Sequence, residues 1–134
     1  MKIADARDEM LAIFKSVWDT AGYVAEWPDL PFTIPTSGPW ARITVKHGTG
    51  GQASLSDENG QRRWNRNGTL FIQIFTEVGN GDVTALGLVQ SVMDAYQSAK
   101  GTVWYRNIRF QEIGTDGSFE QTNVLVDFQY DDIQ

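Results

Sequence analysis

The chain has 134 residues, 41% of them hydrophobic, which suffices for one folded domain with a real core and leaves no room for a second. It carries 11 basic and 17 acidic residues, a net charge of −6, which argues against a general nucleic-acid-binding surface because phosphate contacts need clustered Lys and Arg. The absence of cysteine excludes disulfides and thiolate metal sites, and no apolar stretch is long enough to predict a signal peptide or a membrane span. We therefore expect a single soluble domain over residues 1–134 that stays in the cytoplasm where it is made.

The first predicted element is an amphipathic helix over residues 3 to 20, because apolar side chains recur there at spacings of three and four. They are Ile3, Ala6, Met10, Ile13, Phe14, Val17 and Trp18. Gly22 follows this stripe, and the segment up to residue 39 contains Pro28, Pro31, Pro35 and Pro39. Prolines remove amide donors and favour extended neighbours, so we expect a surface strap.

Alternating polarity predicts two strands after the strap, at residues 40–46 and 69–76. In the second strand, Leu70, Ile72 and Ile74 share one face, while Phe71 and Phe75 lie on the other. Residues 52–56 could form a short strand. The polar stretch 56–67 is rich in Asp, Asn, Gly and Arg and is interpreted as a mobile loop or hairpin tip.

A second helix is predicted from Asp82, a plausible N-cap, to Lys100, with Gly101 as its C-cap. Gly87 lies inside this helix at a cost of about 1 kcal/mol relative to Ala, so we expect a neighbouring backbone to come close to it. Two long strands, 102–113 and 118–130, then flank a turn at 114–117 that is typical of a hairpin.

These elements predict an α+β fold: a mostly antiparallel sheet with two helices packed on one face and a long C-terminal β-hairpin. The opposite sheet face would expose Trp40, Phe71, Phe75 and Tyr105 to solvent. That is more aromatic surface than a monomer comfortably shows, so the pattern indicates an interface.

A search for catalytic, cofactor-binding and metal-binding residues yields none. His47 is the only histidine and is expected to be a solvated residue at the end of a strand. The glycine-rich stretches 48–51 and 79–81 lack the Lys and Ser or Thr of a phosphate-binding loop. Asp127, Asp131 and Asp132 are expected to be solvated charges rather than ion ligands. We therefore expect a protein that is not an enzyme.

One basic and aromatic cluster stands out, formed by Arg62, Arg63, Trp64 and Arg66. Arginines around an aromatic ring can hold single-stranded nucleic acid. Arg is also enriched at protein interfaces, and the chain is acidic overall, so a partner contact is favoured over nucleic acid.

Short segments along nearly the whole chain resemble the tail terminator-like proteins of long-tailed bacteriophages. They are residues 3–7 (IADAR), 27–32 (WPDLPF), 39–45 (PWARITV), 66–70 (RNGTL), 74–75 (IF), 79–81 (GNG) and 128–133 (FQYDDI). Each segment is short, but their order along the chain is similar to that of the family.

The resemblance implies a structural virion protein that assembles in the host cytoplasm and resides in the phage tail. Its copies would close into a ring, expected to be a hexamer, on the tail tube protein, end tube growth and offer a surface to a head completion or connector protein. The resemblance implies no cofactor. DNA would only pass through the lumen of the ring, where acidic residues would repel its phosphates and let it slide. The expected interface residues are Trp40, Arg62, Arg63, Trp64, Arg66, Phe71 and Phe75. Two alternatives remain: a head-to-tail neck subunit, and a small nucleic-acid-binding module that uses the loop of Arg62 to Arg66.

Overall fold

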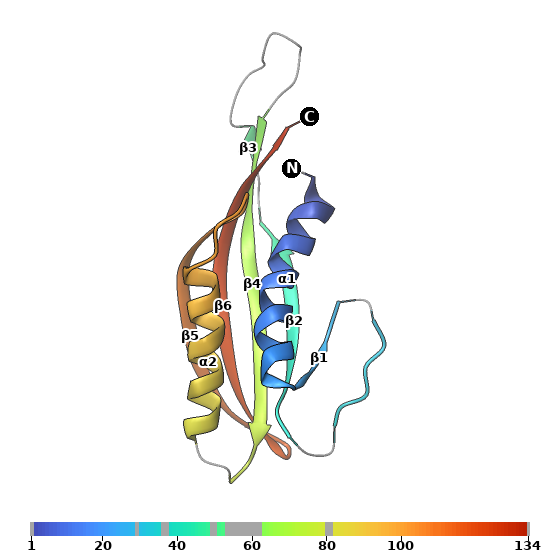
Figure 1. Cartoon of the computed structure of the whole chain (residues 1–134), viewed down its shortest axis with the longest axis vertical. Coiled ribbons are helices and arrows are strands. Elements are labelled where there is room, and N and C mark those ends of the chain that lie inside the picture. The colour runs from blue at the N-terminus through green and yellow to red at the C-terminus, as the bar shows by residue number, and fades with distance from the viewer. Residues whose placement is uncertain are drawn as a thin grey trace.

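The computed structural model of the chain describes residues 2–28, 30–35, 38–48, 51–52, 63–79 and 82–133. Its elements follow one another as α1 (Ile3–Ala21), β1 (Val24–Glu26), β2 (Trp40–His47), β3 (Gly51–Gln52), β4 (Arg63–Glu77), α2 (Asp82–Gln97), β5 (Trp104–Asp116) and β6 (Phe119–Ile133). Figure 1 shows an elongated molecule in which both helices lie in front of one sheet, α1 over β2 and β4, and α2 over β5 and β6. The predicted α+β architecture is confirmed.

The sheet runs in the order β1-β2-β4-β6-β5, and β3 adds a short pairing to β4. The β1–β2 pair is parallel and all other pairs are antiparallel. The longest ladder joins β4 to β6, from Arg63 opposite Ile133 to Glu77 opposite Phe119. The predicted hairpin between β5 and β6 is present, with its turn at Gly117, where φ is 62°.

The core lies between the helices and the sheet. Both helices bury one stripe, which the 3.6-residue period predicts for a helix on a sheet. The buried helix residues are Ala6, Met10, Phe14, Trp18, Val89, Val92 and Tyr96, and they face Ala41, Ile43, Leu70, Ile72, Ile74, Val124, Val126, Phe128 and Tyr130 of the sheet. Strict alternation therefore places the even-numbered residues of β4 and β6 on the helix side, as predicted for Leu70, Ile72 and Ile74.

Helix α1 ends as the sequence indicates. Gly22 takes the left-handed conformation, with φ of 81°, and its N–H bonds to the carbonyls of Trp18 and Asp19. The Trp18 indole N–H then donates to the Val24 carbonyl at 2.8 Å. This bond ties the end of the helix to the strand that follows it.

Three expectations about element boundaries need correction. Val24–Glu26 was expected to belong to the strap but pairs with the start of β2. Strand β4 begins at Arg63, so residues 63–67 are not loop, while residues 53–62 of the expected loop lie outside the described residues. Helix α2 ends at Gln97, so Gly101 does not cap it.

The close approach expected at Gly87 is found instead at Gly68. A Cβ on Gly87 would meet nothing within 4 Å. A Cβ on Gly68 would lie 2.7 Å from the Phe128 ring and 2.8 Å from the His47 Cα, and would also collide with the Lys46 carbonyl. Glycine is required at this point because β2 and β4 lie against the Phe128 side chain there.

Candidate assembly surface

The candidate site is the outer face of the sheet, the side opposite the two helices. The residues that alternation places there include Arg42, Thr44, Phe71, Gln73, Asn123, Leu125 and Asp127. In the described part of the chain no helix covers this face (Figure 1). Antiparallel sheets often have one solvated face, so the question is how much of its apolar surface is already covered.

Trp40 and Phe75 lie on the outer face, as predicted, but they are not exposed. They are register partners in β2 and β4, and their rings stack with centroids 4.1 Å apart and planes 10° from parallel. Trp40 is 3% exposed and Phe75 4%. The expectation that both rings wait for a partner to bury them is therefore wrong.

Three side chains from the same chain supply the cover. Phe32 of the strap stacks on Trp40 at 5.5 Å, and Phe119 approaches the same ring edge-on at 6.0 Å. The Arg42 guanidinium lies over both rings, 5.6 Å from Trp40 and 5.9 Å from Phe75, and is also paired with Glu26 of β1. The strap and the first strand thus close a small second core on the outer face.

Phe71, between Thr44 and Leu125 on this face, is half-buried. Its register partners are Thr44 in β2 and Leu125 in β6, both also half-buried. Gln73 and Asn123 continue the row toward the Trp40 stack. This central strip combines two apolar side chains with polar ones that can hydrogen-bond a partner, as interface surfaces do.

A polar network borders the strip at Asp127. Its carboxylate accepts hydrogen bonds from Thr69 and Asn107 at 3.0 Å each and pairs with Arg109 at 3.4 Å. Partial burial acts to raise the pKa of Asp127, but the bonds from Asn107 and Thr69 and the charge of Arg109 outweigh it, so the pKa is lowered. Asp127 is therefore a fixed anion within a network, which corrects the expectation of a solvated charge.

The Arg cluster is not brought together with the aromatic face. Arg62 lies outside the described residues, and for Arg63 and Trp64 the structure describes only the backbone, in β4. Arg66 is opposite Tyr130 on the helix side of the sheet, and its Nη2 lies 3.6 Å from the Asp132 carboxylate. Among the predicted interface residues whose side chains the structure describes, only Phe71 is therefore a half-buried residue of the outer face.

Asp132 is the residue that sequence reasoning misjudged most, because it was expected to be solvated and is 2% exposed. Besides Arg66, the Lys2 ammonium reaches it at 3.9 Å. The signal was available, since Asp132 continues the alternation of Val126, Phe128 and Tyr130 onto the helix side. Its position near the end of the sequence suggested fraying instead.

His47 lies beside this ion pair. The imidazole is exposed as predicted, yet its Nε2 is 2.7 Å from the Tyr130 hydroxyl and its ring packs against Phe128. Partial burial lowers the pKa of His47, and the charge of Arg66 lowers it further. The neutral ring therefore joins the end of β2 to β6.

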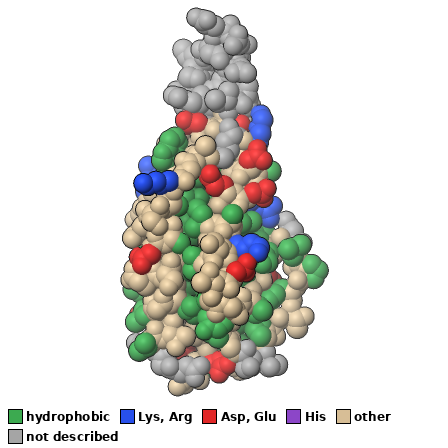
Figure 2. All heavy atoms as spheres, in the orientation of Figure 1, with side chains coloured by type: hydrophobic (Ala, Val, Ile, Leu, Met, Phe, Trp, Pro, Cys, Tyr) green, Lys and Arg blue, Asp and Glu red, His purple; other side chains and the backbone are tan. Residues whose placement is uncertain are grey.

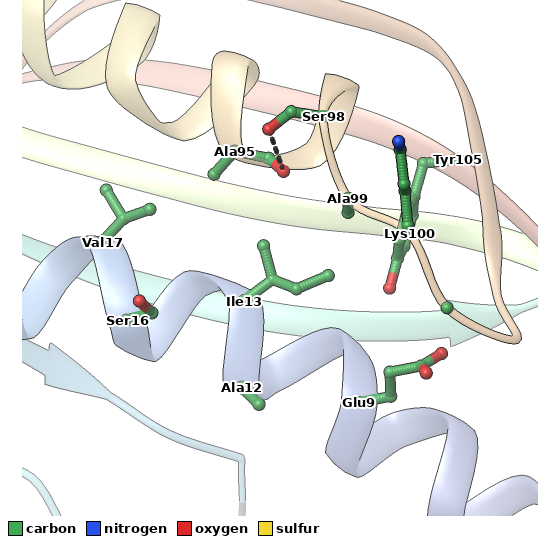
Figure 3. Close-up of a pocket in the computed structure, with 11 residues that line it drawn as sticks. Glu9, Ala12, Ile13, Ser16, Val17, Ala95, Ser98, Ala99, Lys100 and Tyr105 are labelled. Carbon is green, nitrogen blue, oxygen red and sulfur yellow. Dashed lines mark hydrogen bonds between the residues drawn. The ribbon is translucent and has the colours of Figure 1, made fainter.

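A second surface feature is a groove between α1 and α2, drawn in Figure 3. Two cavities of about 490 and 540 Å³ share Ser16 and Val17 and run from Glu9 to Ala21 along α1. Figure 2 shows apolar side chains along the line between the helices. At one end the Glu9 carboxylate accepts from the Thr102 and Val103 amides, at 3.2 and 2.9 Å, and so holds the chain between α2 and β5 in place.

Tyr105 was expected on the outer face and lies on the helix side instead, where it pairs with Phe128 and packs edge-on against Tyr96 at 5.1 Å. Its hydroxyl points toward the space above α1 in Figure 3 and has no hydrogen-bond partner among the described residues. Burial raises the pKa of Tyr105, and the charge of Glu9 raises it further. The outer-face neighbour in β5 is Trp104, which is 56% exposed.

Within the described ranges, no three His, Asp or Glu side chains come together in a way that could hold a metal ion. Neither described helix is long and apolar enough to cross a membrane.

No protein-family model and no curated protein matches the chain. Twenty-eight chains of solved structures do match. One of them, a protein whose name states no function, has a TM-score of 0.62 and 18% sequence identity, and the alignment covers 96% of this chain and 95% of the other. Likeness at this identity shows the fold alone, so the function has to be argued from the surface.

Proposed function

We propose that the protein is a structural subunit of a long phage tail, which closes into a ring on the end of the tail tube, stops its growth and offers a surface for head joining. The observation that carries the proposal is the outer face, a broad sheet surface without a helix over it in the described residues, with Phe71 and Leu125 at its centre. We assign this surface to tail assembly because segments of the sequence resemble tail terminator-like proteins.

Side chains of the same chain already cover part of the outer face, which reduces the area that a partner could contact. Because Phe32 and Arg42 already cover the Trp40 stack, the part of the face left for a partner is the strip around Phe71 together with the exposed Trp104 of β5. We assign it to tail tube protein. A surface of strand side chains suits the end of a tube built from repeated subunits, because the same contact recurs around the ring.

The two alternative functions, a neck subunit and a nucleic-acid-binding module, require different contacts. A neck subunit would bind the head connector in place of the tube, on the same kind of surface. A nucleic-acid module would need Arg66 for phosphate contacts, whereas Arg66 is engaged with the buried Asp132. A net charge of −6 also opposes DNA binding and favours passage of DNA through a ring without sticking.

The test is to add the purified protein to tail tubes polymerised from tube protein and to examine them by electron microscopy. We expect density on tube ends and arrested elongation. The matched variants place two carboxylates on each side of the sheet. Gln73→Glu with Asn123→Glu charges the outer face and should abolish capping, while Val83→Glu with Gln97→Glu charges exposed positions of α2 and should leave it intact.

Binding to isolated head connectors and not to tubes would favour the neck alternative. Salt-sensitive binding to single-stranded nucleic acid, with no binding to either assembly, would favour the nucleic-acid module. Equal loss of capping in both double variants would remove the outer face from the proposal.

A further inference from the structure

Two exposed cations lie at the ends of one row of side chains across the outer face. The row crosses β2, β4, β6 and β5, which are neighbours in that order (Figure 1). Its members, Lys46, Thr69, Asp127 and Arg106, are register partners from strand to strand. Register partners point to the same face of a sheet, and neighbouring strands lie about 4.8 Å apart. The backbones of Lys46 and Arg106 are therefore about 14 Å apart on the outer face.

The centre of this row is an anion that already has partners, whereas its ends have none. Asp127 accepts a hydrogen bond from Thr69 and pairs with Arg109. Lys46 and Arg106 are exposed, and neither side chain makes a hydrogen bond or an ion pair with any residue that the structure describes. A partner that reaches the outer face thus meets two positive charges on either side of a fixed negative one.

Trp104 places an aromatic ring beside one of these cations. It precedes Arg106 by two residues in β5, so the two side chains share the outer face about 7 Å apart. The Trp104 side chain is 56% exposed, in contrast to the buried Trp18 and Trp40. Trp and Arg are the residues that most often contribute strongly to the binding energy of protein interfaces. Their neighbourhood on an uncovered sheet face indicates a protein contact.

Charge complementarity indicates the chemistry of the partner. Helices α1 and α2 carry six acidic and two basic residues, whereas the row and Arg109 together carry three basic residues and one acidic residue. The outer face is thus locally positive on a chain of net charge −6. Phosphates recur at short, even intervals along a nucleic acid, so a strand lying across the row would bring phosphate against Asp127. A protein surface can place carboxylates opposite the two ends alone.

We propose that Lys46 and Arg106 bind carboxylates of a partner protein about 14 Å apart, while an apolar side chain of that partner packs on Trp104. This inference rests on the proposed function and specifies the tail tube surface that the outer face would contact. That surface would be acidic at two points, with a hydrogen-bond donor between them opposite Asp127. Such a contact fixes the register of the two proteins and speeds their encounter.

Charge reversal of the two cations tests the contact. Lys46→Glu with Arg106→Glu should weaken binding to tube ends about tenfold or more, and raising the salt concentration should weaken the binding of the unmodified protein. The control, Lys15→Glu with Lys100→Glu, makes the same change in net charge on the helix side, at exposed positions, and should leave capping intact. The neutral pair Lys46→Gln with Arg106→Gln avoids new repulsion from Asp127 and should also weaken capping.

A second measurement does not depend on tail tubes. Fluorescence anisotropy would follow a labelled polyglutamate peptide, a flexible chain of carboxylates, and a labelled oligothymidylate of matched length. We expect the protein to bind polyglutamate more tightly than oligothymidylate at low salt. Both Lys46 and Arg106 variants should lose this binding, while the helix-side control should keep it. Melting temperatures of all variants would show that each one is folded.

Polyglutamate binding that depends on Lys46 and Arg106, together with capping that they control, supports the inference. The same binding without capping by the unmodified protein would support the carboxylate site and refute the tail role. Capping that both Lys46 and Arg106 variants retain would overturn the inference and leave the proposed function standing. Failure to bind polyglutamate, or equal loss in the helix-side control, would also overturn the inference, and tighter binding of oligothymidylate would reassign the surface to nucleic acid.

Discussion

The indole of Trp40 lies flat against the phenyl ring of Phe75, 4.1 Å away across the β2–β4 pair, on the side of the sheet that no described helix covers. This contact gives the chain two hydrophobic layers, a large one under the helices and a small one under the strap. Because both rings are buried within the single chain, both should stabilise the folded monomer.

Phe75→Ala should lower the free energy of unfolding by about 3 to 5 kcal/mol, as much as Ile74→Ala in the main core. Phe71→Ala is the matched control, because Phe71 is half-buried on the same strand and face and should cost roughly half as much or less. Urea unfolding of the three monomeric variants measures the difference. A loss at Phe75 no larger than that at Phe71 would contradict the second hydrophobic layer.

The buried Asp132 makes Arg66 a stability residue. Arg66→Ala leaves a carboxylate of 3% side-chain exposure without one of its cationic neighbours, and should cost about 2 kcal/mol. Arg109→Ala removes a partner of Asp127 in a more open pair, with side chains 41% and 28% exposed, and should cost less than about 1 kcal/mol. Thermal unfolding at pH 7 compares them, and equal losses would show that burial does not decide the effect.

His47 should titrate below its ordinary value of 6.5, because partial burial and Arg66 disfavour the charged ring. The folded state then binds the proton less well than the unfolded state, so the stability contribution is complete above 6.5 and is lost as the pH falls through that value toward the folded pKa. As the only histidine, His47 gives one imidazole signal in NMR. A midpoint at or above 6.5 would contradict the prediction, and Arg66→Gln should move the midpoint upward.

Alanine substitutions at Gly68 and Gly87 should change the stability of the fold in opposite directions. Gly68→Ala drives a Cβ into the backbone of β2 and the Phe128 ring and should destabilise by about 3 kcal/mol. Gly87→Ala meets nothing within 4 Å on an exposed helix position and should stabilise by up to about 1 kcal/mol. Melting temperatures of the two variants measure this, and destabilisation by Gly87→Ala would reveal a hidden contact.

Periodicity predicted the helices, the face of β4 that carries Leu70, Ile72 and Ile74, and the hairpin, because these elements bury one regular stripe each. It also placed Trp40 and Phe75 on the correct face. It could not predict that they are covered, since the cover comes from Phe32, far from Phe75 in sequence and held there by a proline-rich segment without periodicity. Similarly, three residues of β1 carry too short a pattern to separate a strand from a strap.

The candidate site was predicted less well than the fold. The Arg cluster was grouped by adjacency in sequence, whereas alternation sends neighbouring strand residues to opposite faces, and Arg66 lies on the helix side with Asp132. The face of Tyr105 was misassigned for a similar reason. The pairing of β5 shifts register between Arg106 and Arg109, where Asn107 has a φ of 52°, and an irregular strand gives no clean alternation.

The place of β6 between β4 and β5 sets an order for biosynthesis. Phe119–Ile133 is made after both of its neighbours, so until it emerges from the ribosome the β4 edge that carries Leu70, Ile72 and Ile74 lies open. An open apolar edge is prone to pair with other chains. Any product cut short before residue 119 would therefore aggregate rather than fold partially, and only a chain that has been translated through β6 would reach the native fold.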